Sequence, residues 1–246
     1  MSWPGADPMY NYNTSEANAR RNFYGVSWVP WGEIDGINNP SGANPAWGNT
    51  ILSRSTILPQ ADIGWSGHFD PGSREGFVSV EVTPLDGNDG SKTLHVVLIE
   101  NDLYYMGSNG HPNHHNVMRD MIPNANGTNV NLVDGETTVV DFDFGVPDPI
   151  IIENAKLVIF VQNTANNDIM NSFGIPVLSI VTDCDNGPGD IIDFGAINVQ
   201  DLVKLVSIIM GTDEGSDYCQ LAAADLNEDG YINIQDVVML VEVILG

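Results

Sequence analysis

The sequence has few basic residues. It contains 8 Lys and Arg against 33 Asp and Glu, which gives a formal net charge of −25. Nucleic acids and anionic membrane surfaces are bound through clusters of Lys and Arg, so neither is an expected partner. No stretch approaches the roughly 18 consecutive apolar residues of a transmembrane helix, and we therefore expect no membrane insertion. The first residues also lack the basic start and apolar stretch of a signal peptide.

Cysteine is equally scarce, with Cys184 and Cys219 as the only two. Their spacing is far too wide for a Cys-x-x-Cys redox pair. The two residues bracket a loop and a helix, which predicts a disulfide that closes this part of the chain, and two free buried thiols are the alternative. On the chain-entropy model such a disulfide contributes roughly 3–4 kcal/mol. A disulfide implies an oxidising compartment, so we expect an extracellular or cell-surface protein, with the periplasm as the alternative.

Motifs for catalysis are also missing. The sequence has no Gly-x-Ser-x-Gly elbow and no His-Glu-x-x-His pair. His111, His114 and His115 invite comparison with a zinc site, but adjacent side chains such as the last two point apart on an extended chain, which favours a loop with incidental histidines. Asp141 and Asp143 share one face of an expected strand, where alternating acids are usual on a solvated surface. We therefore expect a protein that is not an enzyme.

An oxygen-rich stretch at 225–236 has the spacing of an EF-hand-like calcium loop. Oxygen-bearing residues occupy positions one, three, five, seven, nine and twelve, and Gly230 allows the tight turn at position six. The expected ligands are Asp225, Asn227, Asp229, Tyr231 through its backbone carbonyl, Asn233 and Asp236. The loop departs from the EF-hand pattern by having Asp at position twelve and no helix-forming segment directly before it. An Asx-rich surface turn is the alternative.

This loop belongs to an internal repeat. Residues 232–246 echo residues 197–211 at an offset of 35, and each copy ends in the Gly that is typical of a helix C-terminus. The earlier loop keeps three of the repeated oxygen-bearing residues, namely Asp190, Asn198 and Asp201. Positions three and five, however, are Ile192 and Phe194, which cannot coordinate a cation. We expect one bound calcium, with the first loop shaped by burial of Ile192 or Phe194.

At these residues the segment 182–246 resembles a dockerin, a calcium-binding module of helices that docks onto cohesin domains. The resemblance implies that positions ten and eleven of each loop contact a protein partner. These are Val199, Gln200, Ile234 and Gln235. Dockerins often have hydroxyl side chains there, so the resemblance argues against an ordinary cohesin. Self-association through the apolar helices is the alternative.

The middle of the chain, 48–181, predicts an antiparallel β-sandwich. Four segments have strand-like patterns, and turn signals separate them without a helical pattern between. The segments are 75–84, 92–101, 137–144 and 155–163. The Gly- and Asx-rich residues 86–91 predict a hairpin between the first two. The expected fold class is mainly β, with an antiparallel sandwich and a small all-α module.

The first part, 1–47, predicts a helix at 14–23 and then a short strand that ends at Asp35-Gly36. The Val29-Pro30 step before this strand resembles the cis-proline segment of a thioredoxin fold, whose Cys-x-x-Cys half is missing upstream. We expect a partial thioredoxin-like segment, truncated or lost, and a Trp-rich loop is the alternative. Phrases at 97–101, 115–123 and 159–163 resemble a bacterial outer-membrane and secreted family that joins a thioredoxin-like domain to a β-sandwich.

Three functional hypotheses follow from these patterns. The first is a secreted or cell-surface protein that is not an enzyme and whose calcium-stabilised, dockerin-like tail mediates attachment or assembly. The second is a subunit of an extracellular filament or polymer. The third is a truncated periplasmic thiol-disulfide protein that lacks its Cys-x-x-Cys motif.

Overall fold

The chain folds into two compact units. A computed structural model describes residues 7–29, 31–37, 39, 44–107, 110–180, 187–192, 195–213, 216, 218–227 and 231–245. The first unit comprises Met1–His68 and Gly76–Ile180, and the second comprises Phe69–Glu75 and Val181–Gly246. We call the first the β unit, and we call the part of the second from Val181 onward the C-terminal module. Most regular structure is antiparallel β, which confirms the mainly-β fold class predicted from the sequence.

The first unit begins with three helices, α1 (Pro8–Tyr12), α2 (Thr14–Phe23) and α3 (Asn44–Arg54). Local sequence explains the first two. Asp7 caps α1 and is followed by Pro8 at the first helical position, where a missing N–H costs nothing. The Asn13 side chain caps α2 by accepting from the Glu16 amide. The predicted helix at 14–23 is confirmed.

Ten strands complete the first unit, and eight of them form two sheets. The three-stranded sheet has the order β1-β2-β8, and the larger sheet has the order β10-β9-β3-β6, with β7 also paired to β3. The strands are β1 (Ala61–Asp70), β2 (Glu75–Pro84), β3 (Gly90–Glu100), β6 (Val117–Ile122), β7 (Thr128–Leu132), β8 (Thr138–Gly145), β9 (Ala155–Asn163) and β10 (Ile169–Pro176). A small ribbon pairs β4 (Leu103–Tyr104) with β5 (Asn113–His114), and short 3₁₀ turns lie at η1 (Ile152–Asn154) and η2 (Val177–Ile180).

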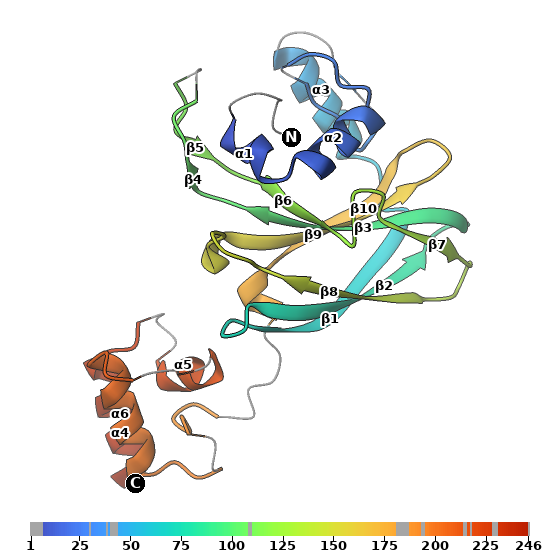
Figure 1. Cartoon of the computed structure of the whole chain (residues 1–246). Coiled ribbons are helices and arrows are strands. Elements are labelled where there is room, and N and C mark those ends of the chain that lie inside the picture. Colours follow the sequence, from blue (N-terminus) through green and yellow to red (C-terminus); the bar gives the residue numbers. More distant parts are fainter. Residues whose placement is uncertain are drawn as a thin grey trace. The chain divides into compact units, whose positions relative to one another are not determined.

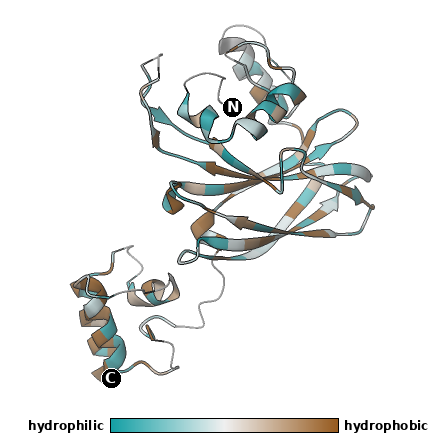
Figure 2. Cartoon of the chain, in the orientation of Figure 1, coloured by the Kyte–Doolittle hydropathy of each residue, from teal (hydrophilic) through white to brown (hydrophobic). Residues whose placement is uncertain are grey.

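The larger sheet is covered on both faces. Its central strand β3 is buried almost throughout, because one face meets the three-stranded sheet and the other faces α1 and α2 (Figure 1). The face toward the helices holds a small cluster in which Val97, Ile99 and Met121 are buried. Elsewhere, strands alternate between apolar and polar residues along their length (Figure 2).

The start of α2 also covers an edge of the larger sheet. The Asn13 amide donates to the Arg119 carbonyl at 3.1 Å, and the Met121 amide donates to the Glu16 carboxylate at 2.7 Å. Both backbone groups belong to β6, which ends the strand order of this sheet. These contacts satisfy edge groups that would otherwise be open to pairing with another chain.

Three sequence expectations for this unit were wrong. Residues 86–91 do not close a hairpin, because β2 and β3 lie in different sheets and the turn links them. The short strand expected to end at Gly36 is reduced to a single bridged residue, Ile34, while Pro30 lies outside the described residues. Helix α3 was not predicted, and it runs across the expected boundary between residues 47 and 48.

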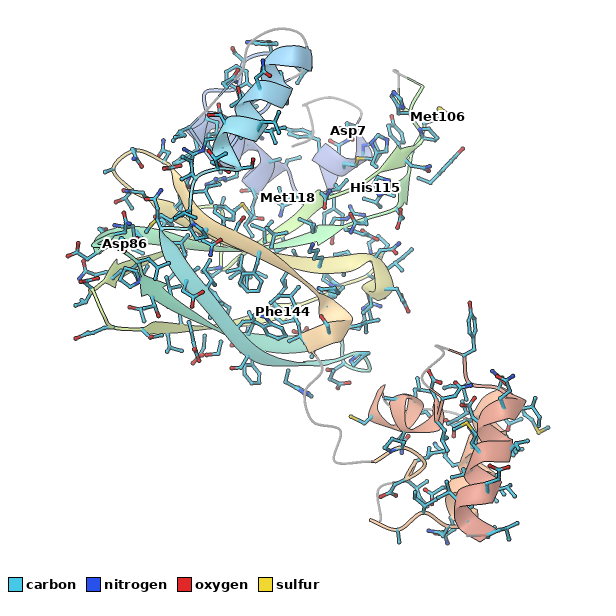
Figure 3. The ribbon with its side chains drawn as sticks, turned by 180° about the vertical axis from the view of Figure 1, so that it is seen from behind. Asp7, Asp86, Met106, His115, Met118 and Phe144 are labelled. Carbon is cyan, nitrogen blue, oxygen red and sulfur yellow. The ribbon has the colours of Figure 1, made fainter. Side chains whose placement is uncertain are left out.

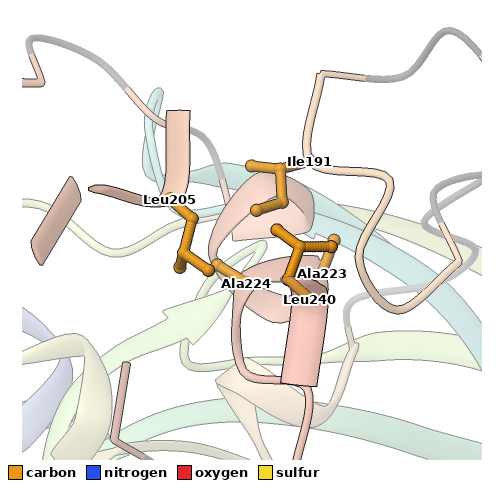
Figure 4. Close-up of a cluster of buried hydrophobic side chains, with 5 residues drawn as sticks. All are labelled: Ile191, Leu205, Ala223, Ala224 and Leu240. Carbon is orange, nitrogen blue, oxygen red and sulfur yellow. The ribbon is translucent and has the colours of Figure 1, made fainter. Parts of the chain in front are cut away.

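The described part of the second unit contains three helices, α4 (Val199–Ile209), α5 (Tyr218–Ala224) and α6 (Ile234–Leu245). Five buried side chains form its core: Ile191, Leu205, Ala223, Ala224 and Leu240 (Figure 4). The repeat is visible there, because Leu205 and Leu240 occupy equivalent positions on α4 and α6. Helix α4 ends in a Schellman motif in which Gly211 has φ +66° and donates to Ile208, while Thr212 donates to Ser207.

Helix α5 corrects the expectation that nothing helical directly precedes the second loop. It ends at Ala224, one residue before Asp225. Its last four residues are Leu and three Ala, which have high intrinsic helix propensity, but the segment is too short to show a clear apolar period. The second loop therefore lies between an incoming and an outgoing helix, as an EF-hand loop does.

Candidate functional site

The two loops of the second unit share one hydrogen-bond framework. In each, the position-twelve carboxylate accepts from the amides of positions two and nine, and the position-nine Asn caps the outgoing helix. In the first loop Asp201 accepts from Ile191 at 2.8 Å and from Asn198 at 2.8 Å. The equivalent bonds of the second loop join Asp236 to Leu226 at 2.9 Å and to Asn233 at 2.8 Å. The Asn side chains donate to the carbonyls of Ala196 and Tyr231.

The first loop completes this framework with protein groups alone. The Ile192 amide also donates to Asp201, at 3.1 Å, and Gly195 at position six donates to Asp190 at position one, at 2.9 Å. Position three is Ile192, which offers no side-chain oxygen, and Phe194 at position five lies outside the described residues. Ile191 is fully buried, whereas Ile192 is only partly buried. The Asp201 carboxylate thus accepts hydrogen bonds from three backbone amides.

The second loop retains the oxygen donors that a hard cation requires. Asp236 is fully buried, and each of its oxygens accepts one backbone amide and keeps a second lone pair. Asp225 and Asn227 stand at positions one and three, and the Tyr231 carbonyl lies at position seven. Asp229, at position five, lies outside the described residues. Carboxylate, amide and carbonyl oxygens are the ligands that Ca²⁺ prefers, so the chemistry of this set fits calcium.

Compensating positive charge is almost absent from the C-terminal part of the second unit. The chain from Asp183 onward holds thirteen acidic residues and one basic residue, Lys204. Lys204 already binds Asp213 at 2.6 Å, and this hydrogen bond lowers the pKa of the Asp213 carboxyl. The buried carboxylates Asp201 and Asp236 therefore rely on backbone N–H groups. Among the described residues, no three His, Cys, Asp or Glu side chains gather as a metal cluster.

Only one of the two cysteines of the expected disulfide lies among the described residues. Cys219 lies in α5 and is disulfide-bonded. Cys184, its expected partner, lies outside the described residues.

Helices α4 and α6 expose two equivalent apolar stripes. Each stripe follows the spacing i, i+4, i+7, i+11, which places its residues on one helix face. We define the first stripe as Val199, Val203, Val206 and Met210, and the second as Ile234, Val238, Val241 and Leu245. Val203 and Val238 are 65% and 54% exposed, and Leu245 at the end of the second stripe is 81% exposed. The predicted contact residues Gln200 and Gln235 are also exposed, next to the first residue of each stripe.

The residues singled out in the β unit do not form a catalytic group. His114 contacts the Tyr105 carbonyl at 2.9 Å. The adjacent His115, labelled in Figure 3, lies 3.2 Å from Asp102 instead. Asp141 and Asp143 are exposed on the outer face of β8. Within the described part of the chain, these side chains share no polar partner.

Sequence reasoning missed two features of the β unit. Arg119 and Glu100 form a buried ion pair at 2.6 Å, and Arg20 and His95 line a cavity beneath α2. A signal was available, since only eight basic residues serve 33 acidic ones. Because basic residues are so few, we expect a buried Arg in such a chain to have a specific partner or function. Periodicity could not show it, because the groups come from distant segments.

No family model and no curated protein match this chain. Among solved structures, it is similar to HBP35 of Porphyromonas gingivalis, with a TM-score of 0.63 and 14% identity over 73% of this chain. The match spans 63% of the HBP35 chain and shows a shared fold. A domain of the outer membrane lipoprotein Omp28 from the same organism gives a TM-score of 0.36 and 16% identity, covering 49% of this chain and 90% of that one. No described helix is long and apolar enough to cross a membrane.

Proposed function

We propose that the chain is a secreted or cell-surface protein, without enzymatic activity, that is held to a protein partner through its C-terminal module. The observation that carries the proposal is the pair of exposed apolar stripes on α4 and α6. Exposed apolar surface of this kind marks interaction sites, because soluble proteins otherwise keep such patches small. The stripes occupy equivalent positions of the repeat, so each offers a similar contact. The dockerin resemblance supports the same use of these helices.

The charge of the module favours a foreign partner over a second copy. Thirteen acidic residues and one Lys give each copy a strongly negative surface, and two such surfaces repel one another. A partner with an apolar acceptor face and basic surroundings avoids this repulsion. Self-assembly into a filament is the second candidate, and it requires calcium or another cation to screen the charge.

Calcium would be held by the second loop, through Asp225, Asn227, Asp229, the Tyr231 carbonyl, Asn233 and Asp236. When bound, the ion supplies the positive charge that the side chains of the module lack. Its place between α5 and α6 would fix the second stripe relative to the first. We propose one calcium ion per chain.

A photo-crosslinking amino acid placed at Val203 or Val238 tests the proposal in the organism that encodes the chain. Attachment predicts a covalent adduct with a different protein, formed from both positions. Adducts at multiples of the chain mass would replace attachment by self-assembly. The matched control carries the same amino acid at Asp141, an exposed position of β8 in the other unit, and should give no adduct. Absence of adducts from either stripe position would overturn the proposal.

Size-exclusion chromatography with light scattering separates attachment from assembly on the purified protein. We expect a monomer both in millimolar calcium and in excess chelator. Large species that form only with calcium would instead identify a filament subunit.

A further inference from the structure

A cavity of about 260 Å³ lies between α2 and the larger sheet. Its walls come from α2, from the paired strands β3 and β9, and from the turn before β7. The lining includes Arg20, Phe23, Thr93, His95, Asn126 and Gln162. Strand register explains the floor, since Thr93 pairs with Gln162 and His95 pairs with Phe160 on the sheet face that meets α2. The cavity is slightly smaller than the 300–1,000 Å³ of common ligand pockets, so it suits one small ring.

Arg20 gives this cavity a positive charge, and no carboxylate among the described residues pairs with it. Its guanidinium donates to the Tyr24 hydroxyl at 2.9 Å and lies 4.7 Å from the Phe23 ring centroid and 6.0 Å from that of Phe160. Burial lowers the pKa of Arg20, while the Tyr24 hydroxyl opposes that change. Ion pairs among the described residues use Arg54, Arg119, Lys204 and His115 instead. In a chain of net charge −25, a half-buried Arg without a carboxylate is prepared for an anion from outside.

His95 adds an unpartnered polar atom on the same wall. The residue is 2% exposed, and its Nδ1 is buried without a hydrogen-bond partner. Its ring stacks on Phe160 at 4.6 Å, which fixes its plane. Burial, with a smaller contribution from Arg20, lowers the pKa of His95 to about 4, so the ring is neutral at ordinary pH. A neutral imidazole can accept or donate a hydrogen bond.

The remaining lining is rich in amides and hydroxyls, as a site for a hydroxylated molecule requires. The Gln162 side-chain N–H group donates to the Asn167 carbonyl at 2.8 Å and to Tyr24 at 3.2 Å, which leaves its carbonyl oxygen as an acceptor. The Asn163 side-chain oxygen accepts a hydrogen bond from the Ala165 amide, which leaves the side-chain N–H₂ group of Asn163 as a donor. Phe23 is 46% exposed at the rim and offers an apolar face to a ring.

We propose that this cavity binds a small hydroxylated carboxylate of the size of one acidic sugar. Arg20 takes the carboxylate, the amide side chains take the hydroxyls, and Phe23 covers one face of the ring. The site lies entirely within the β unit. Whether this site binds a ligand is therefore independent of the attachment role proposed for the C-terminal module.

Titration calorimetry of the whole chain with sodium D-glucuronate tests this assignment. We expect saturable binding, at least about tenfold weaker binding of the uncharged D-glucose, and at least about tenfold loss in Arg20→Gln, as expected for removal of one charge-assisted contact. Arg21→Gln removes the same charge from the neighbouring residue and should bind as the wild type does. Ala19→Leu fills the cavity while keeping Arg20, and it should also abolish binding.

Two results would overturn the proposal. One is no saturable glucuronate binding at about 10 mM, a concentration that would detect even millimolar affinity. The other is equal binding of acetate and glucuronate, which would exclude recognition of the hydroxyls. Unfolding midpoints of Arg20→Gln and Ala19→Leu must match the wild type. If one variant is unstable, unchanged binding by the other is still sufficient to reject the site.

Discussion

The two units bury carboxylates in different ways. In the β unit, Glu100 is 1% exposed and Arg119 binds it at 2.6 Å, so a guanidinium balances the buried charge. In the C-terminal module, Asp201 and Asp236 are fully buried and accept backbone N–H groups. The β unit contains arginines and can neutralise its buried carboxylates internally. The C-terminal module, whose only basic residue is Lys204, depends on its backbone and, as proposed, on a cation from solution.

The largest expected effect comes from breaking the internal pair of the β unit. Arg119→Met leaves Glu100 buried without its cation and should destabilise this unit by about 3–5 kcal/mol. Chemical denaturation followed by tryptophan fluorescence measures the change. Arg21→Met serves as a control and should change stability little. Recovery in the double variant Arg119→Met, Glu100→Gln would show that the uncompensated charge caused the loss.

Cys219→Ser should act on the other unit alone. Loss of its disulfide removes roughly 3–4 kcal/mol from the module on the chain-entropy model. Differential scanning calorimetry should show a low-temperature transition that moves while the transition of the β unit stays in place. A shift of both transitions would mean that the two units unfold together, which would remove the contrast between them.

His95 should make the β unit sensitive to acid. Its pKa is about 4 in the folded protein and 6.5 in the unfolded chain, so the unfolded state binds more protons between these values. Stability is therefore full above pH 6.5 and falls by up to about 3 kcal/mol as the pH drops toward 4. Burial raises the pKa values of Glu16 and Asp120, and these carboxyls act in the opposite sense.

The difference between wild type and His95→Phe isolates the histidine contribution. We expect the variant to lose less stability than the wild type between pH 7 and pH 5 in urea denaturation. Equal losses would show that His95 is not held neutral in the folded state.

Calcium should give the smallest of these effects, and only in the module. Binding to the folded state alone stabilises by about 2.7 kcal/mol at a hundredfold excess over Kd. Asp229→Ala should abolish most of this gain, whereas Asp190→Ala should retain the gain because the first loop lacks ligands at positions three and five. Calorimetric titration should give one ion per chain. Two ions would mean that the first loop also binds.

Local patterns predicted helices α2, α4 and α6 and four strands, β2, β3, β8 and β9, but they did not predict how strands pair. The helix at 14–23 and the strands at 75–84 and 155–163 could be predicted because their sequence signals lie within a few positions of one another. Pairing of β3 with β9 joins residues that are 55 (Glu100 and Ala155) to 71 (Lys92 and Asn163) positions apart, and the turn at 86–91 contains no signal for it. Helix α3 contains Pro45 and Gly48, which oppose a helical reading.

The candidate sites differ in the same respect, namely whether their residues lie close together in the sequence. A calcium loop can be proposed from the sequence alone because its expected ligands follow one another at fixed spacing in twelve residues. The Arg20 cavity could not, since its lining combines α2 with two strands and a turn. Exposure of the stripes on α4 and α6 was partly predictable, because both helices have more apolar residues than one shared interface can cover.

Strand β3 pairs with β6 and β7 along one edge and with β9 along the other. Its amides are enclosed by partners that follow it later in the chain, and β9 cannot join until the residues between have been brought in. Closing such a distant pairing is slow, so the β unit should fold on a longer timescale than the helical module. In hydrogen–deuterium exchange, the amides of β3 should be the last to acquire deuterium, because they open only when the whole sheet comes apart.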